Sequence, residues 1–250
     1  MADKDGKYIY CIINSDVPES FGNTGIGGRG DEVYTVCYKN MAAVISNSPI
    51  KNYRVSRENM MPHEKTIEEA MNEHTVLPVK FGTITESDKA MEDILIREYG
   101  RFDKMLKKMK DKKELGLKAI FKEDVIYKKI LEKYEDIVKL KEVIASKPPG
   151  KTHFQRAKIG EMVENALKNE KDLYRKRILN ALSPLSEDEK TNKEYGDRMI
   201  LNAAFLVNDK KEEKFDIAVN KLDEDYGYLI NFKFVGLVPP FNFVNLVINI

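Results

Sequence analysis

The chain has 250 residues, a formal net charge of +1 and 33% charged side chains, a composition typical of a helix-rich globular protein. This length is sufficient for one large or two small domains, each with its own core. Aromatic residues make up 9% of the chain, which argues against an intrinsically disordered protein. No segment approaches the roughly 18 consecutive apolar residues of a membrane helix, and residues 1–7 lack the apolar core of an export signal. We therefore expect no membrane association and a cytoplasmic location.

The small net charge hides an uneven distribution along the chain. Residues 101–182 hold 23 basic and 13 acidic side chains, whereas residues 1–100 hold 11 basic and 16 acidic ones. A basic segment of this kind is compatible with an acidic partner such as nucleic acid. It is also the usual composition of lysine-rich helices whose charged faces are solvated. Both interpretations remain open, although the segment lacks recognisable nucleic-acid-binding modules.

The first elements of the chain are predicted to be strands, at residues 7–14, 32–38 and 41–46. Apolar and β-branched residues dominate each of them. The only two cysteines, Cys11 and Cys37, fall in the first two strands among apolar neighbours. We expect two buried, reduced thiols, as is usual for a cytosolic protein.

A glycine-rich loop separates the first two strands. Gly25, Gly27 and Gly30 have the spacing of a dinucleotide-binding loop, but that loop must open a helix, and here a strand follows. The pattern therefore favours a glycine turn between two strands, with positive backbone angles. Arg29 lies at the tip of this turn and is a candidate docking residue.

Residues 57–82 predict one helix that runs directly into one strand. Met60, His63 and Ile67 recur at a spacing of three and four, which indicates an amphipathic helix, and Ser56 precedes it as a candidate N-cap. After residue 75 the period changes to two. Pro78 cannot donate to a strand ladder, so we expect this strand at the edge of a sheet or at a bulge.

The middle of the chain is predicted to be mainly helical. An amphipathic helix spans residues 87–110, and residues 114–121 alternate like a strand. Two long helices follow within residues 123–182, and Pro148 and Pro149 must separate them. Long helices joined by a short break predict an antiparallel helical hairpin.

The C-terminal part alternates between strands and a helix. Residues 183–195 read as a polar loop, and residues 198–207 as a buried central strand. A helical stripe ends at Gly227, where we expect a left-handed turn. A last strand covers residues 228–235.

These elements predict an α+β fold with two domains. We place the N-terminal α+β domain at residues 1–112 and the C-terminal domain at residues 113–250. The order of strands and helices in the second domain suggests a ferredoxin-like layout with a long inserted helical hairpin, about residues 123–182.

The three histidines form no recognisable metal or catalytic pattern. His63 and His74 are about 16 Å apart along a helix axis, which is too far to share a metal ion. His63-Glu64 lacks the second histidine of a zinc protease motif, and His153 is isolated. We expect all three to be packing or surface residues, with no enzymatic activity, cofactor or metal.

The last residues, 237–250, contain no charged side chain. Pro239 and Pro240 end the last strand, and Phe241 and Phe243 begin a nearly continuous apolar stretch. An extended apolar segment of this type pairs with another element. Two interpretations remain open: the segment folds back over its own domain, or it docks a partner.

Five blocks of the sequence resemble the gas vesicle protein L/F family. Residues 63–83, HEKTIEEAMNEHTVLPVKFGT, are similar to the central signature of that family. The other blocks lie in order at residues 21–49, 198–207, 212–227 and 239–245. Because the blocks are long and span most of the chain, the resemblance is far more specific than a short motif. Residues 122–193 match least.

The resemblance implies two mixed α/β domains and a role as an accessory protein of gas vesicle formation. Its partners would be the small apolar shell protein and other accessory proteins, during nucleation or assembly or as a minor component of the particle. A shell subunit with an exposed apolar surface aggregates unless another protein shields it. The alternative is a nucleic-acid-associated binding protein that uses the basic middle segment. Adaptable or exposed apolar side chains and the loop arginine are our candidate partner contacts: Arg29, Met60, Met61, Phe81, Phe241 and Phe243.

Overall fold

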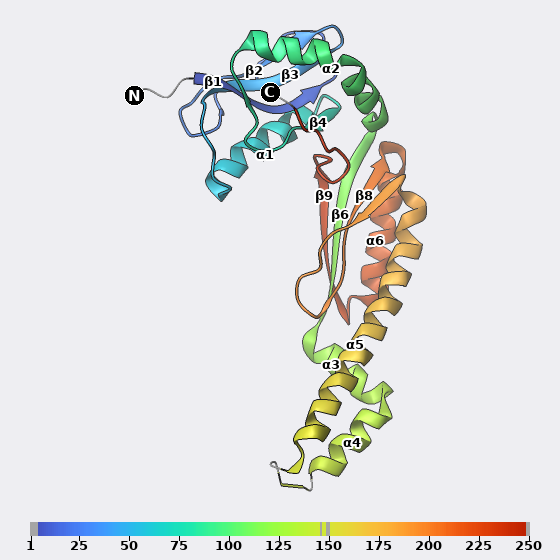
Figure 1. Cartoon of the computed structure of the whole chain (residues 1–250). Helices are drawn as coiled ribbons and strands as arrows, with labels where there is room; N and C mark the ends of the chain where they lie inside the picture. Colours follow the sequence, from blue (N-terminus) through green and yellow to red (C-terminus); the bar gives the residue numbers. More distant parts are fainter. Residues whose placement is uncertain (1–4, 146, 149–150, 249–250) are drawn as a thin grey trace. The chain divides into compact units, whose positions relative to one another are not determined.

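The computed structural model describes residues 5–145, 147–148 and 151–248, and the chain divides into two compact units. Unit 1 comprises residues 1–114 together with residues 237–250, and unit 2 comprises residues 115–236 (Figure 1). The chain therefore passes from one unit to the other twice. The C-terminal residues, which we assigned to the second domain from the sequence, belong to unit 1.

The described residues of unit 1 form one antiparallel sheet and two helices. Its elements are β1 (Asp5–Ile13), β2 (Val33–Tyr38), β3 (Met41–Pro49), α1 (Arg57–Met71), β4 (Val76–Pro78), β5 (Ile84–Thr85) and α2 (Asp88–Met109). The strand order is β2-β3-β1-β4, and β5 also pairs with β1. β4 is the last strand of this order, so the prediction of an edge strand around Pro78 is confirmed.

The centre of the unit 1 sheet is β1. It pairs with β3 from Asp5↔Pro49 to Ile13↔Ala42 and with β4 from Cys11↔Pro78 to Ile13↔Val76. β1 and β3 are buried over most of their length because α1 and α2 lie on opposite sides of the sheet (Figure 1). Continuous apolar sequences are typical of strands covered on both faces.

Unit 2 contains a second sheet and four helices among its described residues. β6 (Lys112–Phe121) leads into it. The following elements are α3 (Glu123–Lys133), α4 (Glu135–Ala145), α5 (His153–Leu182), β7 (Asp188–Thr191), β8 (Met199–Asn208), α6 (Glu212–Tyr226) and β9 (Ile230–Val238), with short 3₁₀ turns at Ser183–Leu185 and Asp209–Lys211. The strand order is β7-β8-β6-β9. β7 and β8 are antiparallel, with Asp188 opposite Leu206.

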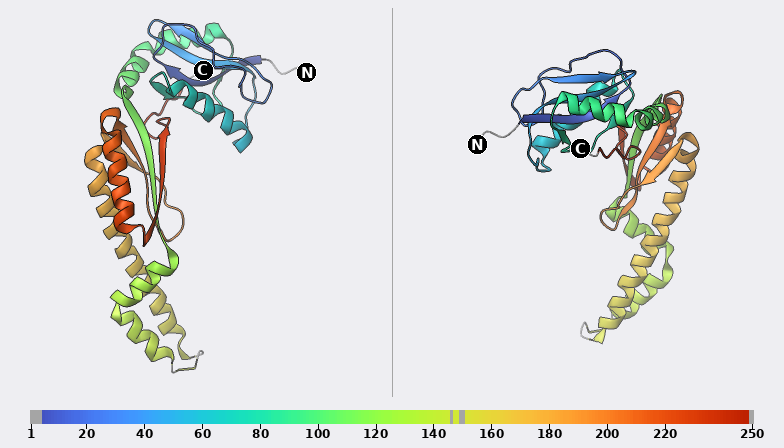
Figure 2. Two further views of the ribbon diagram at one scale, coloured as in Figure 1. Left: turned by 180° about the vertical axis from the view of Figure 1, so that it is seen from behind. Right: turned by 45° about the horizontal axis from the view of Figure 1, so that its top comes forward.

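The helices α5 and α6 cover the same face of the unit 2 sheet (Figures 1 and 2). Their buried side chains, such as Ile178 and Phe215, pack with Phe121, Phe205 and the other inward-facing residues of β6 and β8. α4 and α5 form a helical hairpin that extends beyond the sheet, and Ile137 and Leu167 belong to the same core. The predicted hairpin is therefore present.

Four local predictions are wrong. The helix predicted from residue 123 is broken at Tyr134, which has φ −109 and ψ 78. The predicted loop 183–195 contains the exposed edge strand β7. Ser56 is the N-cap residue of α1 but makes no side-chain capping bond. Gly227 ends α6 with φ −61 rather than in the left-handed region.

The prediction of a fold that mixes strands and helices is confirmed. The structure has antiparallel strands in both sheets and six α-helices in its described part. Part of the predicted break at residues 147–150 lies outside the described residues. Among the helices that are described, none combines the length and the apolar character that crossing a bilayer requires.

Candidate interaction site

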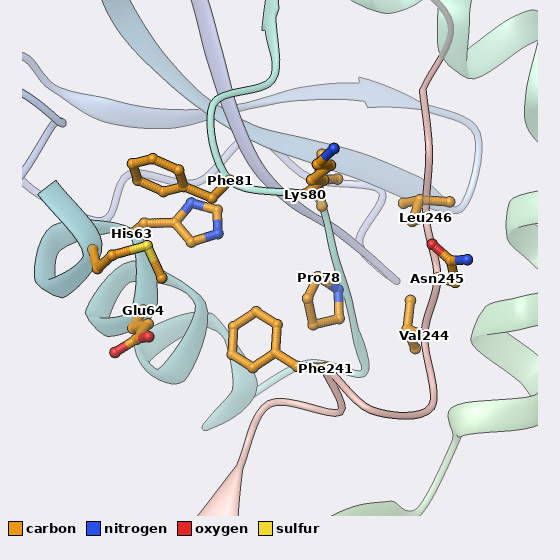
Figure 3. A pocket seen from close by; sticks show the side chains of 11 residues that line it. His63, Glu64, Pro78, Lys80, Phe81, Phe241, Val244, Asn245 and Leu246 are labelled. Carbon is orange, nitrogen blue, oxygen red and sulfur yellow. The ribbon is translucent and has the colours of Figure 1, made fainter. Parts of the chain in front are cut away.

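The most informative site of unit 1 lies where α1, β4 and the C-terminal segment meet. Here we use "C-terminal segment" for residues 239–248. A hollow of about 300 Å³ lies between these three parts of the chain (Figure 3). We call it the tail hollow, and its lining residues are Met60, His63, Glu64, Pro78, Val79, Lys80, Phe81, Phe241, Val244, Asn245 and Leu246.

The side chains of α1 reach this hollow because of helical spacing. Met60, His63 and Glu64 are three or four residues apart, so they share one side of the helix. Ile67 and Ala70 continue the same stripe and are fully buried against the sheet. The hollow therefore begins where the buried stripe of α1 reaches the surface.

A buried hydrogen-bond network holds α1 to the sheet beside the hollow. The Tyr8 hydroxyl lies 3.0 Å from Nδ1 of His63 and accepts a hydrogen bond of 3.0 Å from the Gly82 amide. His63 also makes a hydrogen bond with the Val79 backbone. This network connects β1, α1 and the residues that follow β4.

The electrostatic state of His63 is set by its environment. Only 1% of the residue is exposed, and burial lowers its pKa to about 4, although the hydrogen bond to the Val79 backbone acts in the opposite direction. His63 is therefore neutral at pH 7. Aromatic rings surround it: its ring centroid is 5.7 Å from that of Tyr8 and 5.5 Å from that of Phe81. His63 therefore adds a neutral ring to this side of the hollow, beside the charged side chains of Glu64 and Lys80.

The C-terminal segment forms the opposite wall of the hollow (Figure 3). Val244, Leu246 and Ile248 are buried, with exposures of 6%, 2% and 8%, whereas Val247 is 49% exposed. This alternation is typical of an extended chain lying on an apolar surface. Leu246 forms a parallel bridge with Val79, directly after β4.

Polar contacts fix the start of the C-terminal segment. The Asn242 amide donates to Oε2 of Glu114 at 2.9 Å, and its side chain donates to Oε1 of the same carboxylate at 2.5 Å. Glu114 is 3% exposed, so it is a buried carboxylate held by this residue. The segment therefore packs against its own chain, which is the first of the two interpretations left open by the sequence. It packs in unit 1, however, and not on the C-terminal domain to which we had assigned it.

Three of the six candidate contacts line the tail hollow: Met60, Phe81 and Phe241. Phe241 is 42% exposed at the rim. Phe243 follows it but does not line the hollow. The candidate contacts predicted from the sequence did not include Leu246 or its pairing with β4, because this part of the sequence is a nearly continuous apolar stretch in which Val247 hides the alternation.

The other two candidate contacts lie elsewhere on unit 1. Met61 is 54% exposed and lines a wider hollow of about 1080 Å³ between the glycine loop and α1. Arg29 is engaged by Asp5 and Asp31, at 2.9 Å from each carboxylate. The structure therefore does not bring all six predicted contacts together.

The glycine loop is a turn between β1 and β2, as predicted. Gly27, Gly28 and Gly30 have positive φ angles of 87°, 70° and 74°. The Ile26 amide donates to the Tyr10 hydroxyl at 2.8 Å, which anchors the loop to the core. β2 follows directly, so the loop does not open a helix as a dinucleotide-binding loop does.

One cluster of side chains has the spacing of a metal site. Glu19, Glu73 and His74 place one ligand atom each within 4.8 Å of one another. Nε2 of His74 lies 2.8 Å from Oε2 of Glu19, and the Ser15 hydroxyl donates to the other oxygen of Glu19. The hydrogen bond from Ser15 lowers the pKa of Glu19, burial opposes this, and His74 adds to the lowering.

Comparison with known proteins gives the identity of the chain. The family model described as gas vesicle synthesis protein GvpL/GvpF matches residues 6–245. The chain belongs to this family. The resemblance seen in the five sequence blocks is therefore confirmed for this GvpL/GvpF-family chain.

Several relatives of this family member match over nearly their whole length. Gas vesicle protein F of a Streptomyces species is 28% identical over 240 residues, covering 95% of this chain and 98% of the relative. Gas vesicle protein F1 of Halobacterium salinarum is 25% identical, with coverages of 96% and 92%. Gas vesicle protein F of a Nostoc species is 22% identical, with coverages of 96% and 98%.

Two solved structures share the fold of this GvpL/GvpF-family chain. The crystal structure of the gas vesicle protein GvpF from Anabaena superposes with a TM-score of 0.84 at 20% identity, covering 97% of this chain and 99% of that chain. The crystal structure of GvpF from Microcystis aeruginosa gives a TM-score of 0.76 at 21% identity, with coverages of 96% and 99%. At this identity the likeness establishes the fold.

Proposed function

We propose that this chain is a non-enzymatic accessory protein of gas vesicle formation that binds the apolar shell protein. The observation that carries this proposal is the family match across residues 6–245, with relatives named gas vesicle protein F. Such a protein acts at the gas vesicle or in the cytoplasm where the particle assembles. Contacts with other accessory proteins belong to the same proposal.

The tail hollow is our candidate for the shell-protein contact. It combines the methionine and aromatic side chains of Met60, Phe81 and Phe241 with a neutral histidine. Methionine and aromatic residues supply adaptable, apolar contact area at protein interfaces. A partially exposed ring such as Phe241 is suited to be an anchor for an apolar partner.

The test is co-purification of the shell protein with the full-length chain and with matched phenylalanine variants. Phe241→Ser removes the rim of the tail hollow and should weaken binding roughly tenfold or more. Phe154→Ser removes a more exposed ring on α5 of unit 2, where exposure is 87%, and should leave binding unchanged. No association of the unaltered chain under assembly conditions would disprove the proposed function. Equal losses in both variants would disprove the site.

The nucleic-acid alternative has less support in the arrangement of the basic segment. Lys129 and Lys133 pair with Glu170, and Arg175 and Lys171 pair with Glu194. Because these basic side chains already pair with acidic residues of their own unit, they support the interpretation of the basic segment as a solvated, ion-paired helical surface. We therefore do not propose nucleic acid as a partner.

We also propose that the two units are domains and that the second is ferredoxin-like. Its support is the succession of β6, the helices α3–α5, β7, β8, α6 and β9, with the strand order β7-β8-β6-β9. This is the strand–helix–strand, strand–helix–strand succession of a split βαβ unit. The helices α3 and α4 and the first half of α5 are then the inserted hairpin. The domain boundary expected near Lys112 lies at the start of β6.

A further inference from the structure

The C-terminal segment is attached to unit 1 in a way that permits release. It lies beside β4, the edge of the sheet, and within the described residues its backbone pairing is the isolated bridge between Val79 and Leu246. Pro78 has no amide proton, so the strand edge offers one donor fewer for a longer ladder at this point. Asn242 is held by Glu114, and the Arg101 guanidinium donates to the Val247 carbonyl oxygen at 3.4 Å. Beyond these contacts, side-chain burial rather than a ladder holds residues 244–248.

Two hollows that are open to solvent flank the segment. The tail hollow lies on one side of it, and a second hollow of about 590 Å³ is lined by residues 50–52, residues 80–84, Val247 and Ile248. Because both hollows open to the surface, they leave room beside residues 244–248 for further contacts by a bulkier occupant of this edge. A longer or better-fitting segment would gain contacts that the resident one lacks.

The resident segment defines the chemistry that this edge accepts. Aliphatic side chains enter at alternate positions, Val244, Leu246 and Ile248, and residues 237–250 carry no charge. Specificity in strand addition comes from pockets for alternate side chains of an extended peptide. The matching ligand is an uncharged, extended segment with aliphatic residues at every second position.

We propose that residues 244–248 of the C-terminal segment are a built-in competitor that occupies the edge of β4 until an extended aliphatic segment of the partner replaces them, while Phe241 and the anchored Asn242 stay in place. The tethered segment has a high effective concentration at its own site, so weak partners are excluded and only a segment with more contacts displaces it. The partner chemistry rests on the proposed function, because an apolar shell subunit supplies segments of this kind. The exchange itself rests only on the site described above.

The first experiment uses the chain's own segment as the probe. A fluorescent peptide of residues 244–250 is titrated into the full-length chain and into a chain truncated after Phe243, which keeps Phe241 and the Asn242 contact to Glu114. We expect the peptide to bind the truncated chain and to bind the full-length chain roughly tenfold or more weakly, because the tethered copy competes. The same peptide with Leu246→Asn should bind neither. Equal binding to both chains, or no binding to a truncated chain whose helices α1 and α2 remain protected from hydrogen exchange, would overturn the proposal.

The second experiment avoids truncation by locking the segment in place. Val79→Cys and Leu246→Cys, made in a Cys37→Ser background, put two thiols at bridge-paired positions, where the Cα separation of about 5 Å suits a disulfide. Purified gas vesicle shell protein should bind the reduced chain, and oxidation should weaken that binding roughly tenfold or more. Reduction of the same sample should restore it.

The outcomes separate the exchange from the proposed function. Equal binding of the shell protein to the oxidised and reduced chains would overturn the exchange. If the shell protein binds neither form while the fluorescent peptide binds the reduced chain and not the oxidised one, the built-in competitor stands and the proposed partner is wrong.

Discussion

His63 illustrates how burial decides the charge of a single side chain at the site. It is nearly inaccessible, bonded to the Tyr8 hydroxyl, and surrounded by aromatic rings. Since water is excluded, the neutral imidazole is favoured, and His63 contributes no charge to the wall of the tail hollow. The sequence predicted a packing or surface role for this histidine; the structure shows the packing role.

The low pKa of His63 predicts a pH-dependent stability. Its pKa is about 4 in the folded chain and about 6.5 in the unfolded chain, so the unfolded state binds more protons between these values. The contribution of the neutral His63 to the free energy of unfolding is therefore fully present above about pH 6.5. It falls by up to about 3 kcal/mol as the pH drops to 4. Urea unfolding across this range should show the slope, and His63→Gln should reduce it. His153→Gln, at an exposed position, should retain it, and a slope unchanged in His63→Gln would contradict the assignment.

Glu170 is the corresponding buried charge of unit 2. It is 1% exposed, its Oε1 accepts a hydrogen bond of 2.5 Å from Lys133, and Lys129 lies 3.4 Å from Oε2. Burial by itself would raise the pKa of Glu170, but the hydrogen bond from Lys133 and the charge of Lys129 lower it below its usual range. The carboxylate is therefore ionised at neutral pH. It ties α5 to α3 next to the break at Tyr134.

Removing this charge should destabilise the chain. Glu170→Gln keeps the size of the side chain but leaves the two lysines without their carboxylate, which should cost about 1–3 kcal/mol of unfolding free energy. Glu161→Gln is the matched control, because Glu161 pairs with Lys158 in solvent, where such pairs contribute about 0–1 kcal/mol. Urea denaturation followed by circular dichroism measures both. Equal losses of unfolding free energy in the two variants would mean that the buried ion pair stabilises the chain no more than the exposed one.

At the scale of elements, the two helices of unit 1 begin differently although both follow a serine. The Ser87 hydroxyl accepts a hydrogen bond of 3.1 Å from the Ala90 amide at the start of α2. Ser56 has the same extended backbone before α1 but makes no such bond. Residue type and position alone therefore do not establish a cap, because the side-chain rotamer decides whether the oxygen reaches the helix.

This difference predicts unequal effects of two similar substitutions. Ser87→Ala should lower the unfolding free energy by about 1 kcal/mol, the usual value for a capping hydroxyl. Ser56→Ala should change it by no more than a few tenths, since no bond is lost. Thermal unfolding of the two variants side by side is the measurement. A larger loss in Ser56→Ala than in Ser87→Ala would refute the distinction.

Elements with a strong periodic signal were predictable, and those that depend on contacts were not. α1 follows from an apolar stripe at helical spacing, and β8 from a continuous apolar run. The break at Tyr134 carries no proline or glycine. Gly227 was expected for its positive φ, but its role is close approach, since a Cβ there would lie 2.4 Å from the Asp223 carbonyl oxygen.

At the scale of the whole molecule, the C-terminal segment returns to the unit in which the chain begins. The core of unit 2 is built from β6, β8, β9 and the helices, without residues 237–248. Unit 1 instead depends on the last residues of the chain for part of its burial. Substitutions in the C-terminal segment should therefore change the stability of unit 1, although the segment lies far in sequence from residues 1–114.

A substitution in the segment should accordingly affect unit 1 alone. Leu246→Ala removes a side chain that is 2% exposed and should cost unit 1 about 2–4 kcal/mol. Val247→Ala, at a neighbouring residue that is 49% exposed, should cost much less. Hydrogen exchange measured by mass spectrometry should become faster in α1 and β4 of Leu246→Ala. Equally faster exchange in β8 would contradict the separation into two cores.

The amino-acid sequence by itself determined the family, most helices and strands, and the apolar nature of the C-terminal segment. These properties depend on local order: side-chain periodicity, proline and glycine positions, and long matching blocks. Only the tertiary structure decided that Leu246 pairs with Val79 and that Met60, Phe81 and Phe241 line one hollow. An alternating pattern defines which side chains a strand buries, but the surface that buries them is chosen by shape and packing between residues distant in sequence.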